Sequence, residues 1–143
     1  MPRRLPRNVL RRLPTAGPAL LVVVVAVGVA SCGGGERRTG DADLQLSWSF
    51  RPDPPRVGNA EIGVEVSDVD WTPRNGATVI LTGLREGVTL VVDTAVGQGA
   101  GRYVDPAFPF EVAGDWVLRA RVETLEGRWV EVERALRVEA GPS

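Results

Sequence analysis

Apolar and polar residues alternate along most of the chain from residue 44 onward. In LQLSWSF (44–50), every second position is apolar and the three positions between are polar. The same alternation runs through 60–67, 116–123 and 130–138. A period of two is that of a half-buried β-strand, whereas an amphipathic helix repeats every 3.6 residues. The pattern therefore predicts an all-β fold.

Short turns rich in glycine and proline separate these stretches, namely RPDPP (51–55), WTPRNG (71–76) and GQGAG (97–101). Proline cannot donate a hydrogen bond to a sheet ladder, and glycine accepts the backbone angles of tight turns. The turns divide the region into about seven strands, at the spacing typical of an antiparallel sandwich. We expect an immunoglobulin-like β-sandwich over residues 44–139.

The first 31 residues have a different character. Five arginines lie within the first twelve positions, and the apolar run ALLVVVVAVGVA follows at 19–30. A membrane-crossing helix needs about 20 apolar residues, whereas the apolar part of a secretory signal needs about 7 to 15. The run is therefore typical of a signal peptide over residues 1–31. An uncleaved anchor over 16–32 is the alternative, although Gly17 and Pro18 would interrupt it.

The only cysteine of the chain, Cys32, directly follows Val29, Ala30 and Ser31. These four residues resemble the lipobox of bacterial lipoproteins, in which the cysteine receives diacylglycerol before cleavage on its N-terminal side. The resemblance implies that Cys32 is lipidated and holds the protein on the cell membrane or outer membrane, facing the periplasm or cell exterior. A free or buried thiol is the alternative. Residues 32–43, which are glycine-rich and charged, are predicted to form a flexible tether.

Charge and composition exclude several classes of function. From Cys32 onward the chain has 12 arginines against 18 acidic residues, a net charge of −6, which argues against nucleic acid as a partner. The chain has no histidine and no lysine, so the usual bases that activate a serine nucleophile are absent. A pair of carboxylates could still act as acid and base in a cleft, although small sandwiches rarely enclose one. We therefore expect no enzymatic activity, no catalytic residue and no cofactor.

The segment from Pro55 to Val122 resembles the YtkA-like family of small immunoglobulin-like modules, to which FixH-like domains are similar in style. The matching pieces are PPRVGNAEIGVEVSD, NGATVIL, GRY and AGDWVLRARV. The resemblance implies periplasmic copper handling or assembly of a respiratory oxidase, because YtkA-like domains are often rich in histidine and methionine. Soft Cu(I) needs thiolate, thioether or imidazole ligands. This chain has no histidine, its one methionine is Met1, and Cys32 is expected to be acylated, so no metal site is predicted.

Candidate partner-binding residues lie in a turn and on a late strand. They are Trp71, Pro73, Arg74 and Trp129. An exposed tryptophan flanked by arginine and acidic residues is typical of an interface anchor, and loops of sandwiches often carry recognition. The alternative is that a loop or an edge strand covers each ring. Trp48 and Trp116 fall on apolar faces, which favours the core.

Three aspartates, Asp53, Asp68 and Asp70, could supply oxygen ligands to calcium. Their spacing matches no calcium loop, which favours turn aspartates that bond their own backbone. The glycines of 97–101 precede a strand rather than a helix, which indicates a hairpin turn and not a phosphate site.

Together these features favour a membrane-anchored, non-catalytic binding or accessory module outside the cytoplasm. We expect an adaptor for a membrane protein complex, respiratory or transport-related, with the Trp71 loop touching the partner. The alternatives are the metal-handling role that the family resemblance implies and a purely structural envelope module.

Overall fold

The computed structural model describes residues 35–142, which form eight antiparallel β-strands. The strands are β1 (Glu36–Gly40), β2 (Leu44–Arg51), β3 (Gly58–Asp68), β4 (Thr78–Arg85), β5 (Val88–Gly99), β6 (Arg102–Phe110), β7 (Gly114–Glu123) and β8 (Trp129–Val138). The predicted signal peptide, the lipobox residues Val29 to Ser31 and the lipidation site Cys32 lie outside the described residues. Within residues 35–142, no helix is long and apolar enough to cross a membrane.

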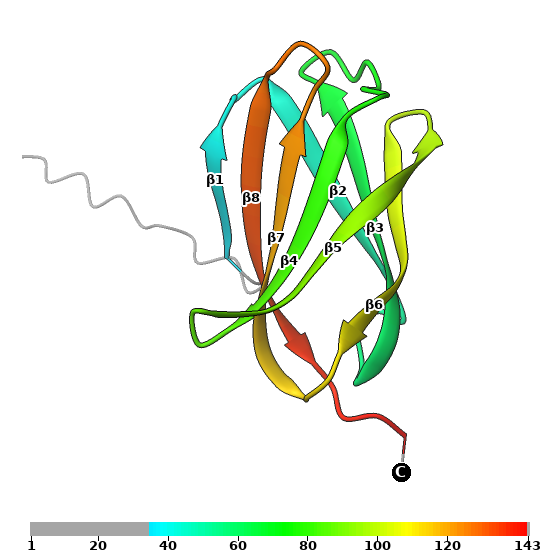
Figure 1. Cartoon of the computed structure of the whole chain (residues 1–143), viewed down its shortest axis with the longest axis vertical. Coiled ribbons are helices and arrows are strands. Elements are labelled where there is room, and N and C mark those ends of the chain that lie inside the picture. Colours follow the sequence, from blue (N-terminus) through cyan, green and yellow to red (C-terminus); the bar gives the residue numbers. More distant parts are fainter. Residues whose placement is uncertain (1–34, 143) are drawn as a thin grey trace, which may run out of the picture. The chain divides into compact units, whose positions relative to one another are not determined.

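The strands form one sheet that curls into two layers (Figure 1). Their order is β1-β8-β7-β4-β5-β6-β3-β2. Strand β5 makes the transition, because residues 88–95 pair with β4 and residues 96–99 pair with β6. The first layer is therefore β1, β8, β7 and β4, and the second is β6, β3 and β2. The prediction of an all-β antiparallel sandwich is confirmed.

The apolar positions of the alternating pattern meet between the two layers. Strands β3, β4, β7 and β8 each supply fully buried residues to one common core. Phe110 lies edge-on to Trp116, with ring centroids 5.2 Å apart and an interplanar angle of 87°, a favoured geometry for aromatic pairs. The indole N–H of Trp116 donates to the carbonyl oxygen of Val112 over 2.9 Å. Trp116 is thus a core residue as predicted, and Trp48 packs against the same core while half-buried.

The structure differs from the sequence prediction at the start of the domain. Residues 36–40, which the sequence places in a flexible tether, form β1 and pair with β8 from Glu36 opposite Arg134 to Gly40 opposite Val130. Their sequence, ERRTG, has no apolar residue and so no visible period of two. Main-chain ladder bonds make this strand, and the Arg38 guanidinium adds a hydrogen bond to the carbonyl oxygen of Leu44. Among the described residues, the strands therefore begin at Glu36, and there are eight of them instead of about seven.

Candidate functional site

The connection between β3 and β4 holds the most exposed aromatic residue of the described chain. Trp71 is 80% exposed, and its backbone adopts a left-handed conformation with φ of 65°. For a bulky side chain this conformation is rare and costs about 1–3 kcal/mol. Such a conformation persists only where the surrounding structure enforces it. This connection is called the Trp71 loop (residues 69–77). Its contacts must hold Trp71 in the left-handed conformation.

Hydrogen bonds within the loop close a tight turn around Trp71. The Trp71 N–H donates to the carbonyl oxygen of Asp68 over 2.9 Å, and the Asp68 N–H donates to the carbonyl oxygen of Thr72 over 3.0 Å. The Thr72 N–H donates to the carboxylate of Asp70 over 3.2 Å. Asp70 is therefore a turn aspartate that bonds nearby backbone, as the sequence favours.

A second set of bonds ties the loop to the start of β6 and to the turn that precedes it. The Tyr103 hydroxyl donates to the carbonyl oxygen of Arg74 over 2.7 Å and accepts from the N–H of Ala77 over 2.9 Å. The Gly101 N–H donates to the side-chain oxygen of Asn75 over 2.8 Å. Tyr103 is 2% exposed, so its ring belongs to the core while its hydroxyl holds the second half of the loop, from Arg74 to Ala77. The sequence shows Tyr103 only as part of the GRY motif and gives no signal for this role.

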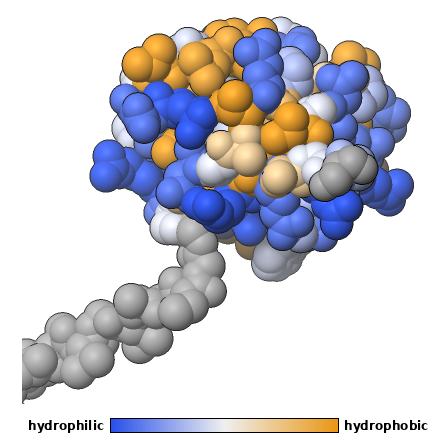
Figure 2. Space-filling model, turned by 90° about the horizontal axis from the view of Figure 1, so that it is seen from below, coloured by the Kyte–Doolittle hydropathy of each residue, from blue (hydrophilic) through white to orange (hydrophobic). Residues whose placement is uncertain are grey.

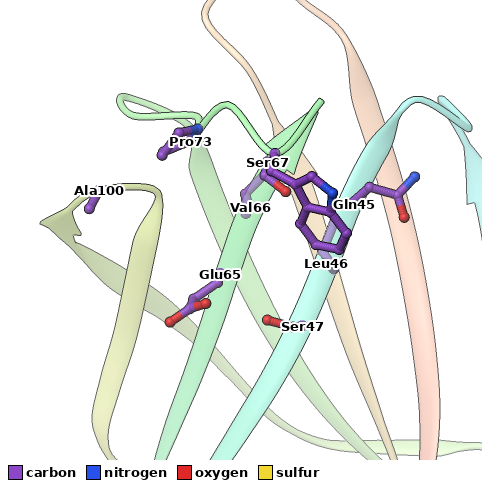
Figure 3. Close-up of a pocket in the computed structure, with 9 residues that line it drawn as sticks. Gln45, Leu46, Ser47, Glu65, Val66, Ser67, Pro73 and Ala100 are labelled. Atoms are coloured by element: carbon purple, nitrogen blue, oxygen red, sulfur yellow. The ribbon is translucent and has the colours of Figure 1, made fainter. Parts of the chain in front are cut away.

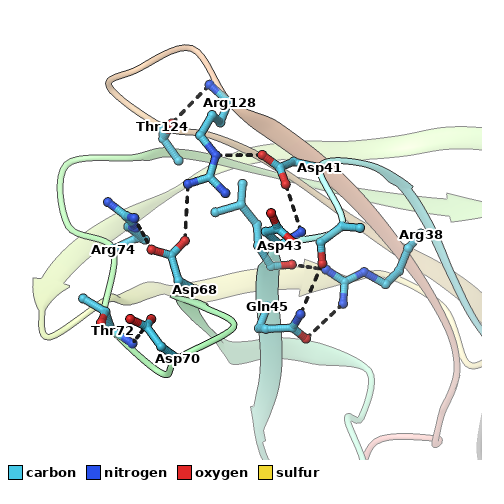
Figure 4. A network of polar contacts seen from close by, with 12 residues as sticks. Arg38, Asp41, Asp43, Gln45, Asp68, Asp70, Thr72, Arg74, Thr124 and Arg128 are labelled. Carbon is cyan, nitrogen blue, oxygen red and sulfur yellow. Dashed lines mark hydrogen bonds and ion pairs between the residues drawn. The ribbon is translucent and has the colours of Figure 1, made fainter.

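Charged side chains brace the same end of the sandwich (Figure 4). Arg74 forms an ion pair with Asp68, and Arg128 bridges Asp41 (Nε to Oδ2, 2.7 Å) and Asp68 (Nη1 to Oδ1, 3.3 Å). The hydrogen bond from Arg74 lowers the pKa of Asp68 below its ordinary value, and the hydrogen bond from Arg128 does the same to the pKa of Asp41. The side chain of the candidate residue Arg74 is thus engaged in an ion pair with Asp68, and this ion pair positions the loop.

Trp71 lines a groove of about 260 Å³ on the outer face of β2 and β3, and Figure 3 labels the other residues that line it. The floor of this groove comes from two cross-strand pairs, Gln45 with Ser67 and Ser47 with Glu65. Pro73 forms one wall, and a bridge to Ser67 holds it in place. The candidate residues Trp71 and Pro73 therefore lie together at one groove. Its polar floor forms because the strand register places these polar side chains side by side.

Trp129, the fourth candidate, lies elsewhere. Trp129 is 36% exposed, and its ring packs under the guanidinium of Arg121, 4.6 Å from the ring centroid. The ring also covers Gly40 of β1, where an added Cβ would come within 2.9 Å of it. Trp129 thus fastens the edge strand β1 to β8, which agrees with the alternative that an edge strand covers the ring.

The three aspartates considered for calcium do not meet. Asp53 follows β2, whereas Asp68 and Asp70 lie at the end of β3 that pairs with the start of β2. Within residues 35–142 no group of three His, Cys, Asp or Glu side chains could hold a metal ion.

The opposite end of the sandwich also exposes apolar residues, which Figure 2 shows as separate areas among hydrophilic ones. Val88 beside the β4–β5 hairpin and Val112 in the β6–β7 turn are exposed there. Both are aliphatic, and neither belongs to the hydrogen-bonded Trp71 loop. An exposed aromatic held in a fixed loop therefore distinguishes the Trp71 end.

Comparisons with known proteins show similarity at the level of solved structures. No family model matches the chain, and no curated protein matches it, so the YtkA-like resemblance stays a prediction. The structure of CopC from Methylosinus trichosporium OB3b is similar with a TM-score of 0.48 and 16% identity, over 70% of this chain and 97% of that one. The PmoD soluble domain from Methylocystis sp. ATCC 49242 is similar with a TM-score of 0.46 and 12% identity, over 76% of this chain and 98% of that domain. Likeness at this level carries no functional argument for the chain.

Proposed function

We propose that this chain is a lipid-anchored, non-catalytic binding module of the cell envelope that recognises a partner protein through the Trp71 loop. The observation that carries the proposal is the conformation of Trp71. The residue is exposed and left-handed, and two separate sets of hydrogen bonds enforce that state. Strain retained at an exposed aromatic is typical of a functional position.

The rigidity of the loop favours recognition over a purely structural role. Binding costs free energy when loops and side chains must be ordered, and a preorganised loop avoids much of that cost. Two further apolar side chains, Val69 and Leu125, are exposed at the same end, and the Leu125 side chain lies close to Gly76 of the loop. A tryptophan with apolar neighbours and a polar surround is the usual composition of a binding hot spot.

The proposed anchor would hold the module close to the bilayer. Only residues 33–35 separate Cys32 from the start of β1 at Glu36. Four extended steps from Cys32 to Glu36 span at most about 14 Å. Because β1 is part of the sheet, this distance is shorter than that of the twelve-residue tether expected from the sequence. The partner would therefore be a membrane protein or a protein that approaches the membrane, which fits an adaptor for a membrane complex.

Copper handling, which the family resemblance implies, has little chemical support in this chain. The sequence contains no histidine, and its one methionine and one cysteine are Met1 and Cys32. Cu(I) would therefore find no soft ligand within residues 35–142. We expect a Cu(I) titration of the purified protein to give no saturable heat, and a stoichiometric heat would make metal handling the better proposal.

The proposal is tested by photo-crosslinking in cells. A photoreactive amino acid at position 71 of the full chain should capture one dominant envelope protein, identified by mass spectrometry. The matched control carries the same group at Thr94, an exposed position of β5 that pairs with β4 in the other layer. Capture at 71 and not at 94 supports the proposal. Equal, diffuse capture at both positions would favour a structural envelope module instead.

A second measurement tests the anchor. Replacing Cys32 by serine should move the protein from the membrane fraction to the soluble fraction and should remove the acyl mass from the N-terminal peptide. An unmodified Cys32 peptide from the wild-type chain would contradict the lipid anchor and would leave the Trp71 test unaffected.

A further inference from the structure

We propose that the groove beside Trp71 receives an arginine or lysine side chain from a basic segment of the partner protein. This inference rests on the proposed function and names the chemistry that the partner must present.

The lining combines an apolar wall with hydrogen-bond acceptors. Trp71, Leu46 and Pro73 supply the apolar part, against which the methylene stem of a long basic side chain can lie. The indole face attracts a guanidinium or ammonium group through its quadrupole, and tryptophan does so best among aromatic residues. Glu65 supplies a carboxylate on the floor of the same groove. An aromatic face beside a carboxylate therefore fits a cation with an apolar stem.

The small polar side chains complete this set. The hydroxyls of Ser47 and Ser67 can each accept a hydrogen bond from a cationic group. The amide oxygen of Gln45 already accepts from the guanidinium of Arg38 over 3.4 Å, which shows that this floor can accept from a cation. Figure 3 shows Ser47 and Glu65 on neighbouring strands, with Gln45 and Ser67 farther along the same two strands. At about 260 Å³ the groove lies just below the range usual for drug-sized ligands, which suits one inserted side chain.

Glu65 remains available for such a cation. Its nearest basic neighbour is Arg102, with 3.7 Å between Nη1 and Oε1, and Arg102 also lies 3.6 Å from Glu61. Both distances exceed those of a charge-assisted hydrogen bond, so Arg102 holds neither carboxylate tightly. The Glu65 side chain is 61% exposed. Among the described residues that line the groove, Glu65 is the one that carries a charge.

The rim of the groove has an excess of negative charge. Asp70 lies next to Trp71, and Asp43 directly precedes β2. Of the nearby arginines, Arg74 and Arg128 are paired with aspartates of the network in Figure 4. Arg38 is the cation beside the groove floor, where it donates to the carbonyl oxygen of Leu44 and to Gln45. The chain from Cys32 onward also carries a net charge of −6. A basic partner segment would thus be attracted before contact, whereas an acidic peptide would be repelled.

The test uses the full chain in detergent micelles and a fluorescein-labelled peptide, Gly-Arg-Gly-Arg-Gly, with fluorescence anisotropy as the readout. Its twin replaces both arginines by citrulline, which keeps the shape and removes the charge. We expect the citrulline peptide to bind about tenfold more weakly, and E65Q to weaken the arginine peptide about 3- to 10-fold. W71A should weaken it by a similar factor.

The control variant is E86Q, which removes the same charge at the β4–β5 hairpin, at the other end of the sandwich. It should leave the affinity for the arginine peptide unchanged. Equal weakening by E65Q and E86Q would mean that only the overall charge matters, and equal binding of the citrulline peptide would mean that the groove does not select a cation. Either result would overturn the inference.

A parallel arm separates this inference from the proposed function. Crosslinking from position 71 is repeated with E65Q in the same chain, where a clear fall in captured partner is expected. Unchanged capture of one dominant partner would leave the binding module standing and refute the cation groove. Binding of an uncharged oligosaccharide such as maltohexaose that E65Q does not alter would also refute it, and would indicate a glycan ligand.

Discussion

Removing the Tyr103 hydroxyl should loosen the Trp71 loop without disturbing the core. Tyr103 is 2% exposed, and phenylalanine preserves its ring. The hydroxyl takes part in two hydrogen bonds, one to the carbonyl oxygen of Arg74 and one from the N–H of Ala77. Y103F therefore leaves two partly buried backbone groups of the loop without their partner, and it creates no cavity comparable to a truncated side chain.

The size of the effect follows from these two bonds. A typical hydrogen bond contributes about 1 kcal/mol net, and leaving a buried backbone group unpaired costs about 1–3 kcal/mol. For two groups that are only partly buried, we expect Y103F to lower the free energy of unfolding by about 2 kcal/mol. For a domain of this size that corresponds to a fall of roughly 10 °C in Tm.

Urea unfolding followed by circular dichroism measures the stability, and hydrogen exchange measures the local effect. The Ala77 amide should exchange faster in Y103F, whereas the amides of the β7–β8 ladder should change only as far as global stability does. Crosslinking yield from position 71 should also fall. A stability loss below about 0.5 kcal/mol, or an Ala77 amide with unchanged exchange, would refute the role of the hydroxyl as the clamp of the loop.

Three further predictions concern other positions. Gly101 has φ of 71° and would place a Cβ 2.4 Å from the carbonyl oxygen of Val66, so G101A should cost at least about 2 kcal/mol by thermal unfolding, whereas G99A, at φ of 83° with open space, should cost only about 1 kcal/mol. Equal losses would show that the clash with the backbone is absent. Truncating the fully packed Trp116 in W116A should cost about 3–5 kcal/mol in urea unfolding, and a loss below 1 kcal/mol would contradict its place in the core. Asp105 is 3% exposed, and burial raises its pKa above 3.8, so the folded state keeps a proton that the unfolded state has lost and stability should fall as pH rises through the raised pKa. D105N should remove that decline, and parallel pH profiles of the two proteins between pH 4 and 8 would contradict the assignment.

The sequence by itself determined the fold class of this protein. Alternation of apolar and polar residues is a local property, since side chains of a strand point to opposite faces in turn, and it correctly placed most strands. It also placed Trp116 in the core and Trp71 in a turn. The same reasoning missed β1, because an edge strand of charged residues is held by main-chain bonds to β8 and shows no apolar period.

Only the tertiary structure decided how the candidate residues are used. Trp71 and Pro73 meet the polar floor of the groove because β2 and β3 pair in one register, and register is a contact between distant parts of the chain. Arg74 forms an ion pair with Asp68, and the ring of Trp129 packs on Gly40 of β1. Such pairings form between residues that are distant in the sequence and are brought together by folding. The pattern of polarity along the chain therefore does not predict them.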